Sequence, residues 1–361
     1  MKRAVFINGR FLTQLLTGVQ RYSRELVSSL DRLIQQEPDT RTNWTLLCPE
    51  RVHVNLALRA IRTVTVRGLG SHFWEQGALA YAARGGVLVS LGNSGPLCHR
   101  RHLVVIHDAS VFRTPENYSW QYATAHRSLT RLLARSAHLA TVSHFSQREL
   151  AELLGLRQTA IAIVPDGVDH VIGRAPDRSI VPRLGLSGSK YLLCVGSLAP
   201  NKNLARAVKA FHATNESTGK MVIVGGLSEN VFRHGLPEVS DNIVIAGRVS
   251  DEELIALYQN AIAFVFPSLY EGFGIPPLEA MAHGCPVLAS DIEPIREVCA
   301  DAAIYFDPFN ISQMATVFKQ ALGGAFERDR LIENGKRQTS VYNWRTSAQA
   351  LQRAIYRIAG E

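Results

Sequence analysis

Short apolar runs alternate with helical patterns along the whole chain, and this rhythm constrains the fold more than any other feature. In the first half the apolar, β-branched-rich runs are Ala4–Ile7, Thr45–Cys48, Val87–Ser90, Leu103–Ile106, Leu139–Val142 and Ile161–Val164. In the second half they are Tyr191–Val195, Met221–Val224, Ile243–Ala246, Ala263–Phe266, Val287–Ala289 and Ala303–Tyr305. Strands that alternate with helices predict parallel sheets covered by helices on both faces.

The length and one polar segment divide this α/β pattern into two domains. A chain of 361 residues exceeds what one hydrophobic core usually supports. Gly173–Ser179 and Gly185–Ser189 are rich in Gly, Pro and Ser, so we place a linker near 171–188. We therefore expect two doubly wound, Rossmann-like domains over 1–172 and 185–339, and an amphipathic helix from Trp344 to Ile358.

Two glutamates stand eight positions apart in a Gly- and Pro-rich segment after one predicted strand. Glu271 lies in the loop beside Gly272 and Gly274, and Glu279 lies one turn into a helix that we expect to begin at Pro277. A strand, a glycine loop and a helix N-terminus present N–H donors to a phosphate or a sugar hydroxyl. Helix electrostatics alone would also favour a glutamate near such a terminus.

Polar groups follow several other strands at their carboxyl ends, where ligands bind in sheets of this kind. His107 and Asp108 come directly after Leu103–Ile106, although a lone histidine is more often structural. Lys202 follows Tyr191–Val195, and a lysine can stabilise a departing diphosphate. Some of these segments could instead serve only to cap helices. The candidate N-cap residues are Thr17 before the first helix, Ser143 or Ser146, and Ser250 beside Arg248.

Taken together, these motifs resemble family 4 of the retaining, nucleotide-sugar-dependent glycosyltransferases with the GT-B fold. The resemblance covers essentially the whole chain and is strongest over 191–308. It rests on the E-x7-E pair Glu271 and Glu279, the His107–Asp108 pair, Lys202, and Pro165–Asp169, in which Asp166 replaces the family's Asn. It implies an interdomain cleft and a C-terminal crossover helix, so that 340–361 would return to the first domain.

The resemblance also implies roles for individual residues. Glu271, His107 and Lys202 would be catalytic. The donor would contact Gly18, Gly196, Lys202, Asn203, Arg248, Gly272, Phe273, Gly274, Ile275 and Glu279, with Glu279 on the nucleotide ribose. The acceptor would contact Asp108, Arg21 and Tyr22. The family's arginine near Ser197 is absent, which weakens a two-cation clamp on the diphosphate, and no bound metal or other cofactor is expected.

The opening segments, Asn8–Phe11 and Thr17–Tyr22, look most like bacterial mannosyl- or rhamnosyltransferases of O-antigen or exopolysaccharide assembly. We therefore expect a hexosyltransferase that uses a nucleotide sugar, with GDP-mannose as the first donor to test, and a glycan or lipid-linked acceptor. The alternatives are a sugar-nucleotide epimerase of the same fold and a non-catalytic sugar-nucleotide-binding subunit. A glycoside hydrolase would not need Lys202 or the glycine loops.

Charge is uneven along the chain. Residues 1–175 hold 21 Lys and Arg against 12 Asp and Glu, whereas 176–361 hold 18 against 19. Arg127, Arg131 and Arg135 recur on an expected helix over Gln121–Ala137, which favours either a solvated face or contact with an anionic membrane. No nucleic-acid motif accompanies them. Without a signal peptide or an 18-residue apolar run, we expect a cytoplasmic protein, peripheral at most, and its five scattered cysteines favour reduced thiols.

Overall fold

The computed structural model describes residues 3–53, 56–197, 199–225 and 240–360. The chain divides into two compact units, the first formed by Met1–Gly167 with Tyr342–Glu361 and the second by Val168–Val341. The sequence placed these boundaries at 172, 185 and 340, with a linker between. In the structure that segment belongs to the second unit, where Ile180–Arg183 form the short helix α7.

The first unit contains a parallel sheet of seven strands within the described residues, in the order β3-β2-β1-β4-β5-β6-β7. The strands are β1 (Arg3–Asn8), β2 (Thr42–Cys48), β3 (Arg62–Thr65), β4 (Val87–Ser90), β5 (His102–Val105), β6 (His138–Thr141) and β7 (Ile161–Ile163). The order reverses between β1 and β4, which pair through Val5–Val87, Phe6–Leu88 and Ile7–Val89. A polar ligand is expected at the carboxyl ends of strands that flank such a reversal.

The second unit repeats this plan with six described strands, all parallel, in the order β10-β9-β8-β11-β12-β13. They are β8 (Tyr191–Val195), β9 (Lys220–Val224), β10 (Ile243–Gly247), β11 (Ala263–Phe266), β12 (Val287–Ser290) and β13 (Ala303–Phe306). The order reverses between β8 and β11, which pair from Ala263–Leu192 to Val265–Cys194. The predicted class of two doubly wound α/β domains is confirmed.

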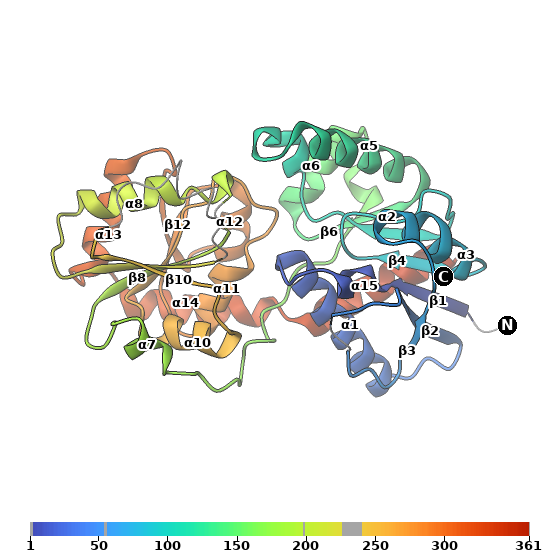
Figure 1. Ribbon diagram of the computed structural model, residues 1–361, viewed down its shortest axis with the longest axis horizontal. Coiled ribbons are helices and arrows are strands. Elements are labelled where there is room, and N and C mark those ends of the chain that lie inside the picture. The colour runs from blue at the N-terminus through green and yellow to red at the C-terminus, as the bar shows by residue number, and fades with distance from the viewer. Residues whose placement is uncertain (1–2, 54–55, 198, 226–239, 361) are drawn as a thin grey trace. The chain divides into compact units, whose positions relative to one another are not determined.

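Helices cover the faces of each sheet. In the first unit they are α1 (Gly18–Gln36), α2 (Ser71–Trp74), α3 (Ala80–Ala82), α4 (Ser110–Arg113), α5 (Trp120–Ser136), α6 (His144–Leu154) and α15 (Trp344–Ala359). In the second they are α7, α8 (Leu204–Ala213), α10 (Asp251–Asn260), α11 (Ile275–Ala282), α12 (Glu293–Cys299), α13 (Ile311–Leu322) and α14 (Arg328–Val341). Figure 1 shows α8 and α13 on one side of the second sheet and α10, α11 and α14 on the other.

Short turns of other helical types lie between these elements. They are η1 (Gly9–Thr13), η3 (Pro115–Asn117), η4 (Gln158–Ala160) and η5 (Pro200–Lys202), which are 3₁₀, and η2 (Glu75–Leu79), which is a π-helical turn. A π-turn is rare and often marks a functional position. All five cysteines lie in the described ranges without a disulfide, and only Cys98 among them is exposed.

The last helix belongs to the first unit, as the resemblance implied. α15 lies beside α1, where the red and blue ends of the chain meet in Figure 1. It buries Ala348, Leu351 and Ile355 of the apolar stripe that the sequence predicts, together with Trp344, while Ile358 of that stripe is only partly buried. The Trp344 ring meets the Tyr22 ring edge-on at 5.8 Å between centroids. Within the described residues, no helix is both long enough and apolar enough to cross a bilayer.

Candidate active site

Two loops of the second unit meet where its strand order reverses. One follows β8 and the other follows β11, its neighbour in the sheet. The amide of Leu269 donates to the Asn201 carbonyl at 2.7 Å, and the Asn203 side chain donates to the Pro267 carbonyl at 3.0 Å. These bonds fix the two loops to each other, so side chains on them have a defined spacing.

Lys202 and Glu271 form an ion pair across these two loops. The lysine Nζ lies 2.6 Å from Oε1 of Glu271, and the side chains are 23% and 13% exposed. The same Nζ lies 5.8 Å from the centroid of the Phe266 ring, at the end of β11. The structure therefore brings together, in one partly buried place, the cation and the first carboxylate that the sequence singled out separately. An ammonium has further N–H donors for an anionic ligand.

Glycines let the backbone come close at this edge of the sheet. Gly274 has φ +121°, and a Cβ there would lie 2.8 Å from Cδ1 of Ile295. A Cβ on Gly225 would lie 1.8 Å from the Gly196 carbonyl oxygen, so only glycine fits opposite Gly196. Gly272 and Phe273 are buried, and Ile275 rather than Pro277 begins α11, with both prolines in the first turn.

Glu279 is only 6% exposed and is held by two partners that the sequence analysis missed. His170 Nε2 lies 3.1 Å from its Oε1, and the Tyr258 hydroxyl donates to Oε2 at 3.3 Å. The His283 ring stacks on Tyr258 with centroids 6.2 Å apart. His170 follows the Pro165–Asp169 segment and Tyr258 lies on α10, so no local pattern joins them to Glu279. The carboxylate is thus fixed in orientation inside the second unit.

Asn203 does not have the surroundings that a donor-binding residue needs. It is 5% exposed, and its amide donates to the Pro267 and Pro308 carbonyls at 3.0 and 2.8 Å. Its Oδ1 accepts from Arg206. These bonds use both amide hydrogens, so we correct the predicted role: Asn203 ties loops together.

Arg248 is exposed directly after β10. Next to it, Ser250 caps α10 in a capping box with Glu253, so the predicted cap is confirmed. The cap fixes where α10 begins. The cap does not bear on Arg248, whose contact with the donor stays a prediction.

His107 lies after β5 in the first unit and is 8% exposed. Its Nε2 lies 2.9 Å from the Leu91 carbonyl, which can only accept, so Nε2 carries the proton. Burial lowers the pKa of His107, against the Leu91 hydrogen bond and the Asp108 charge, which raise it. The imidazole is therefore neutral near pH 7. The nearby helix cap is confirmed, because the Ser143 side chain accepts from the Ser146 amide at 2.9 Å.

The residues predicted to meet an acceptor lie in different surroundings. Asp108 is half-buried and accepts from the Ser110 amide at 2.8 Å, and Arg21 is half-buried on α1. Tyr22 is fully buried, with its hydroxyl donating to the Val164 carbonyl at 3.0 Å and its ring 4.6 Å from His107. A side chain in this position supports the core, so the predicted acceptor contact of Tyr22 is wrong.

Gly18, the predicted donor glycine of the first unit, is exposed at the start of α1. A Cβ at this position would meet no described atom within 4 Å. Thr17 precedes it, but its side chain makes no capping hydrogen bond to the helix backbone. It contacts the Gln20 side chain instead. The prediction that the Thr17 side chain caps the helix backbone is therefore wrong.

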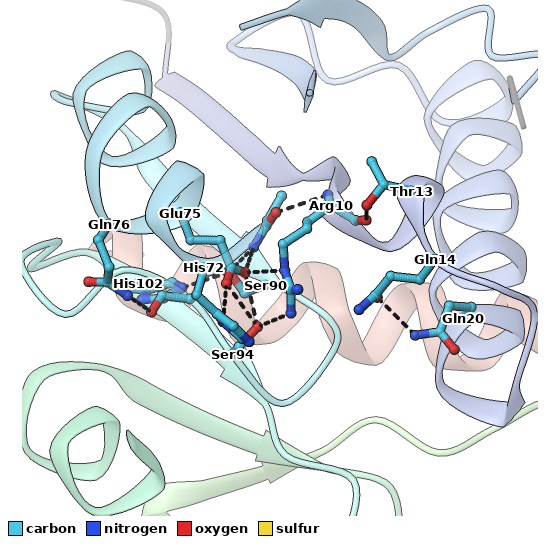
Figure 2. Close-up of polar contacts among 12 residues, drawn as sticks. Arg10, Thr13, Gln14, Gln20, His72, Glu75, Gln76, Ser90, Ser94 and His102 are labelled. Atoms are coloured by element: carbon cyan, nitrogen blue, oxygen red, sulfur yellow. Dashed lines mark hydrogen bonds and ion pairs between the residues drawn. The ribbon is translucent and has the colours of Figure 1, made fainter. Parts of the chain in front are cut away.

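A buried polar cluster at the reversal point of the first sheet was not predicted (Figure 2). Glu75, in the π-helical turn, accepts from Asn8 at 2.7 Å and from Ser94 at 3.0 Å. Arg10 Nε lies 3.1 Å from the same carboxylate, and Arg10 Nη2 donates to Ser94 at 2.8 Å. Burial would raise the pKa of Glu75, but His72, Arg10 and these donors outweigh burial and lower it. Its partners lie 67 and 19 residues away, beyond any local motif.

Comparison with known proteins identifies the class to which this fold belongs. Residues 178–338 match the family described as glycosyl transferases group 1. Sucrose-phosphate synthase from Thermosynechococcus elongatus has the same fold, with a TM-score of 0.75 at 17% identity over 99% of both chains. WaaG, a glycosyltransferase involved in lipopolysaccharide biosynthesis, matches with a TM-score of 0.69 at 17% identity, over 99% of this chain and 100% of its own. The protein is a glycosyltransferase of the GT-B fold.

Curated relatives include proteins named as mannosyltransferases. O-antigen chain mannosyltransferase B of Escherichia coli is 29% identical over 265 residues, which cover 69% of this chain and 68% of the relative. O-antigen chain mannosyltransferase RfbU of Salmonella typhimurium is 28% identical over 236 residues, or 62% and 63% of the two chains. A further structural match with the same fold is HepE of Anabaena in complex with UDP, with a TM-score of 0.68 at 15% identity over 98% of this chain and 99% of its own. The chain carries a group 1 glycosyltransferase domain, as the resemblance implied, and acts as a hexosyltransferase.

Proposed function

We propose that this protein transfers mannose from GDP-mannose, with retention of configuration, to a growing surface glycan or a lipid-linked acceptor. The observation that carries the proposal is the Lys202–Glu271 ion pair at 2.6 Å, at the reversal point of the second sheet. Relatives named as O-antigen mannosyltransferases support the choice of sugar and acceptor. The bound UDP of a structural neighbour supports a nucleotide-linked donor.

The chemistry follows from where charge develops. As the bond from the anomeric carbon to the diphosphate oxygen breaks, the sugar becomes positive and the diphosphate negative. Lys202 stabilises the departing diphosphate, and Glu271 binds the sugar hydroxyls and favours the positive carbon. An acceptor oxygen forms the new bond on the same face, and its proton passes to the departing phosphate oxygen. Glu279 binds the ribose hydroxyls, His107 meets the donor sugar, and no metal enters this scheme.

We also propose that the protein works at the cytoplasmic side of a membrane when its acceptor is lipid-linked. Arg131 and Arg135 are exposed on α5, while Arg127 donates to the Val111 carbonyl. Exposed Lys or Arg near anionic lipid gains about 1 kcal/mol each. Binding to liposomes that contain anionic lipid tests this contact, and Arg131→Gln with Arg135→Gln should weaken it.

Incubation with GDP-mannose, other GDP-sugars, UDP-sugars and dTDP-sugars tests the proposed reaction. A transferase releases free nucleotide by transfer or slow hydrolysis, an epimerase changes the sugar without releasing nucleotide, and a binding subunit does neither. Glu271→Ala should cut nucleotide release by about 100-fold or more while the fold remains intact. The exposed Glu333→Ala on α14 is the matched control. Release by Glu271→Ala within a few-fold of the parent would show that the site is misplaced.

A further inference from the structure

Glu279 lies in a buried hydrogen-bonded cluster whose members come from three separate segments of the second unit. His170 follows the Pro165–Asp169 segment, Tyr258 lies on α10, and Glu279 lies in the second turn of α11. α10 and α11 cover the same side of the second sheet (Figure 1). The His170 side chain is fully buried, whereas 8% of the Glu279 side chain remains exposed. A ligand can thus reach a small part of the carboxylate, and the protein covers the rest.

Both oxygens of this carboxylate have a partner in the protein. Nε2 of His170 lies 3.1 Å from Oε1, and because an ionised carboxylate only accepts, this nitrogen carries the hydrogen of the bond. The Tyr258 hydroxyl lies 3.3 Å from Oε2 and 3.5 Å from the Pro276 carbonyl, so its single hydrogen is shared between two acceptors. His170 is therefore the principal partner of the carboxylate, and Tyr258 is the weaker one.

A second set of contacts holds His170 in place. Nε of Arg174 donates to the His170 carbonyl at 2.9 Å. Nη1 of the same arginine lies 3.1 Å from Asp251 and 3.4 Å from Glu252, both in the first turn of α10. The segment that carries His170 is therefore bound to the helix that carries the second partner of the carboxylate. The two partners consequently keep a defined spacing.

The hydrogen bonds that Glu279 already makes limit what it can bind. A carboxylate has about four acceptor positions, two on each oxygen, and the protein occupies one on Oε1 and one on Oε2. The two that remain lie side by side and match two hydroxyl groups on neighbouring carbons, as in the 2′ and 3′ hydroxyls of a ribose. A 2′-deoxyribose supplies only one of these hydrogens and leaves a largely buried acceptor without a partner, which costs free energy.

We propose that His170, assisted by Tyr258, positions Glu279 for a ribose diol and thereby makes the site select ribonucleotide sugars over 2′-deoxyribonucleotide sugars. GDP- and UDP-sugars belong to the first class and dTDP-sugars to the second. His170 contacts the carboxylate and not the ligand, so it is a positioning residue. Without it, the Glu279 side chain turns away from the orientation in which both oxygens face the diol. This inference rests on the proposed donor-binding function and adds the class of nucleotide that the same site accepts.

Nucleotide binding to the full-length protein tests this selection without a sugar or an acceptor. The probes are two matched pairs, GDP with 2′-deoxy-GDP and UDP with 2′-deoxy-UDP, each measured by calorimetric titration. We expect the parent to bind one ribonucleotide about tenfold or more tightly than its deoxy partner, as a hydrogen bond to a charged group predicts. His170→Phe keeps an aromatic ring and removes the N–H, so this preference should fall to about threefold or less.

Three further variants separate the hydrogen bond from the shape of the side chain. His170→Gln should keep most of the preference, because its amide nitrogen can occupy the position of Nε2 and donate the same bond. Tyr258→Phe removes the weaker bond and should lower the preference less than His170→Phe does. The exposed His212→Ala on α8 is the matched control and should leave all affinities unchanged.

A purely structural role of His170 predicts a different result. His170→Phe would then weaken the ribonucleotide and its deoxy partner equally, and this unchanged preference would overturn the proposal. A parent that does not distinguish the two members of either pair, or that binds none of the four nucleotides, would overturn it as well. Should His170→Phe fail to fold, His170→Asn takes its place. The shorter amide stops at the position of Nδ1 and does not reach Glu279, so the same fall in preference is expected.

Initial rates of nucleotide release from GDP-mannose keep this result apart from the proposed function. Because the ribose lies away from the anomeric carbon, His170→Phe should raise KM and leave kcat within a few-fold of the parent. A fall in kcat of about 100-fold at unchanged KM would place His170 at the reacting centre and overturn the proposal. If UDP binds and GDP does not, GDP-mannose is the wrong donor, and the UDP pair still decides the role of His170. If GDP-mannose is the donor and His170→Phe keeps the preference, the inference alone fails.

Discussion

Asp166 keeps its proton at a pH at which an ordinary aspartate has lost it. The side chain is 3% exposed at the end of the first unit, and burial raises its pKa to about 8 from a usual value of 3.8. Between these two values the unfolded chain is ionised at this position and the folded chain is not. Unfolding then releases a proton, so this group makes the protein less stable as pH rises from about 4 to 8.

Asp166→Asn should therefore stabilise the protein in a pH-dependent way. Asn has a similar shape and cannot ionise, so the gain should be near zero at pH 4 and largest at pH 8. Urea unfolding midpoints from pH 4 to pH 8 measure it, with the exposed Asp241→Asn as control for the loss of a carboxylate. A gain that is the same at every pH would contradict the assignment of the proton to Asp166.

At the same scale, the proposed role of Lys202 is to bind the donor diphosphate beside Glu271, with which it forms an ion pair. Lys202→Ala should weaken binding of GDP and slow transfer together, because the ammonium that balances the diphosphate is lost. Calorimetric titration with GDP and initial rates with GDP-mannose measure the two effects. Lys209→Ala, an exposed lysine of α8, is the control. Unchanged affinity and rate would move the diphosphate role to Arg248.

Some site residues could be predicted from the sequence, and others could not. Lys202 and Glu271 were both found because each follows an apolar strand, and adjacent parallel strands bring such positions together. The hydrogen bonds of Glu279 with His170 and Tyr258 span 109 and 21 residues and follow no periodic pattern. The predicted ligand contacts of Tyr22 and Asn203 were wrong because both side chains are buried. They lie beside strand ends, yet their polar atoms form hydrogen bonds inside their own unit.

At the scale of elements, strands with an apolar core face were predictable and polar ones were not. All twelve predicted strands are present, with ends shifted by up to three residues. The strand that was missed is β3, an edge strand that is mostly exposed and reads Arg-Thr-Val-Thr. The π-helical turn at Glu75 was also missed, because it depends on tertiary contacts with Asn8 and Ser94.

The junction of α1, α15 and the end of the first unit gives a stability prediction. A Cβ on Gly167 would lie 2.4 Å from the Trp344 backbone nitrogen, and the Trp344 side chain is fully buried against Tyr22. Trp344→Ala should cost about 3–5 kcal/mol of unfolding free energy, because it leaves a cavity. Urea unfolding measures this, and the exposed Trp120→Ala should cost far less.

Removal of 340–361 should have a stronger effect on the same junction. It exposes apolar surface on α1 and on the sheet, and we expect aggregation and loss of activity. Size-exclusion chromatography measures the aggregation, and an assay of nucleotide release measures the loss of activity. A truncated protein that stays monodisperse and active would show that α15 is dispensable.

At the scale of the whole molecule, each unit has its own buried core. In the second unit one cluster joins α8 and α13 to the sheet, and it includes Leu192, Val265 and Phe318. In the first, one cluster includes Val104 and Leu139, and another includes Trp74 and Leu88. Two cores allow the units to unfold in separate steps.

GDP should therefore shift one thermal transition more than the other. The proposed diphosphate and ribose contacts all lie in the second unit, so that unit should gain stability, by about 2.7 kcal/mol at a ligand concentration 100 times Kd. Calorimetry of the intact protein measures it. Val265→Ala and Val104→Ala assign the transitions, because each variant weakens one core. A shift confined to the Val104-sensitive transition would contradict the assignment of donor binding.

The return of α15 to the first unit sets an order of events during synthesis. The strands of that unit leave the ribosome first, yet the helix that covers α1 emerges only after all of the second unit has been made. The apolar face of α1 in the nascent first unit therefore remains uncovered while residues 168–341 are translated. A premature stop codon after the second unit would produce a chain with both sheets but an open face on the first, and such a chain is a natural client for chaperones and proteases.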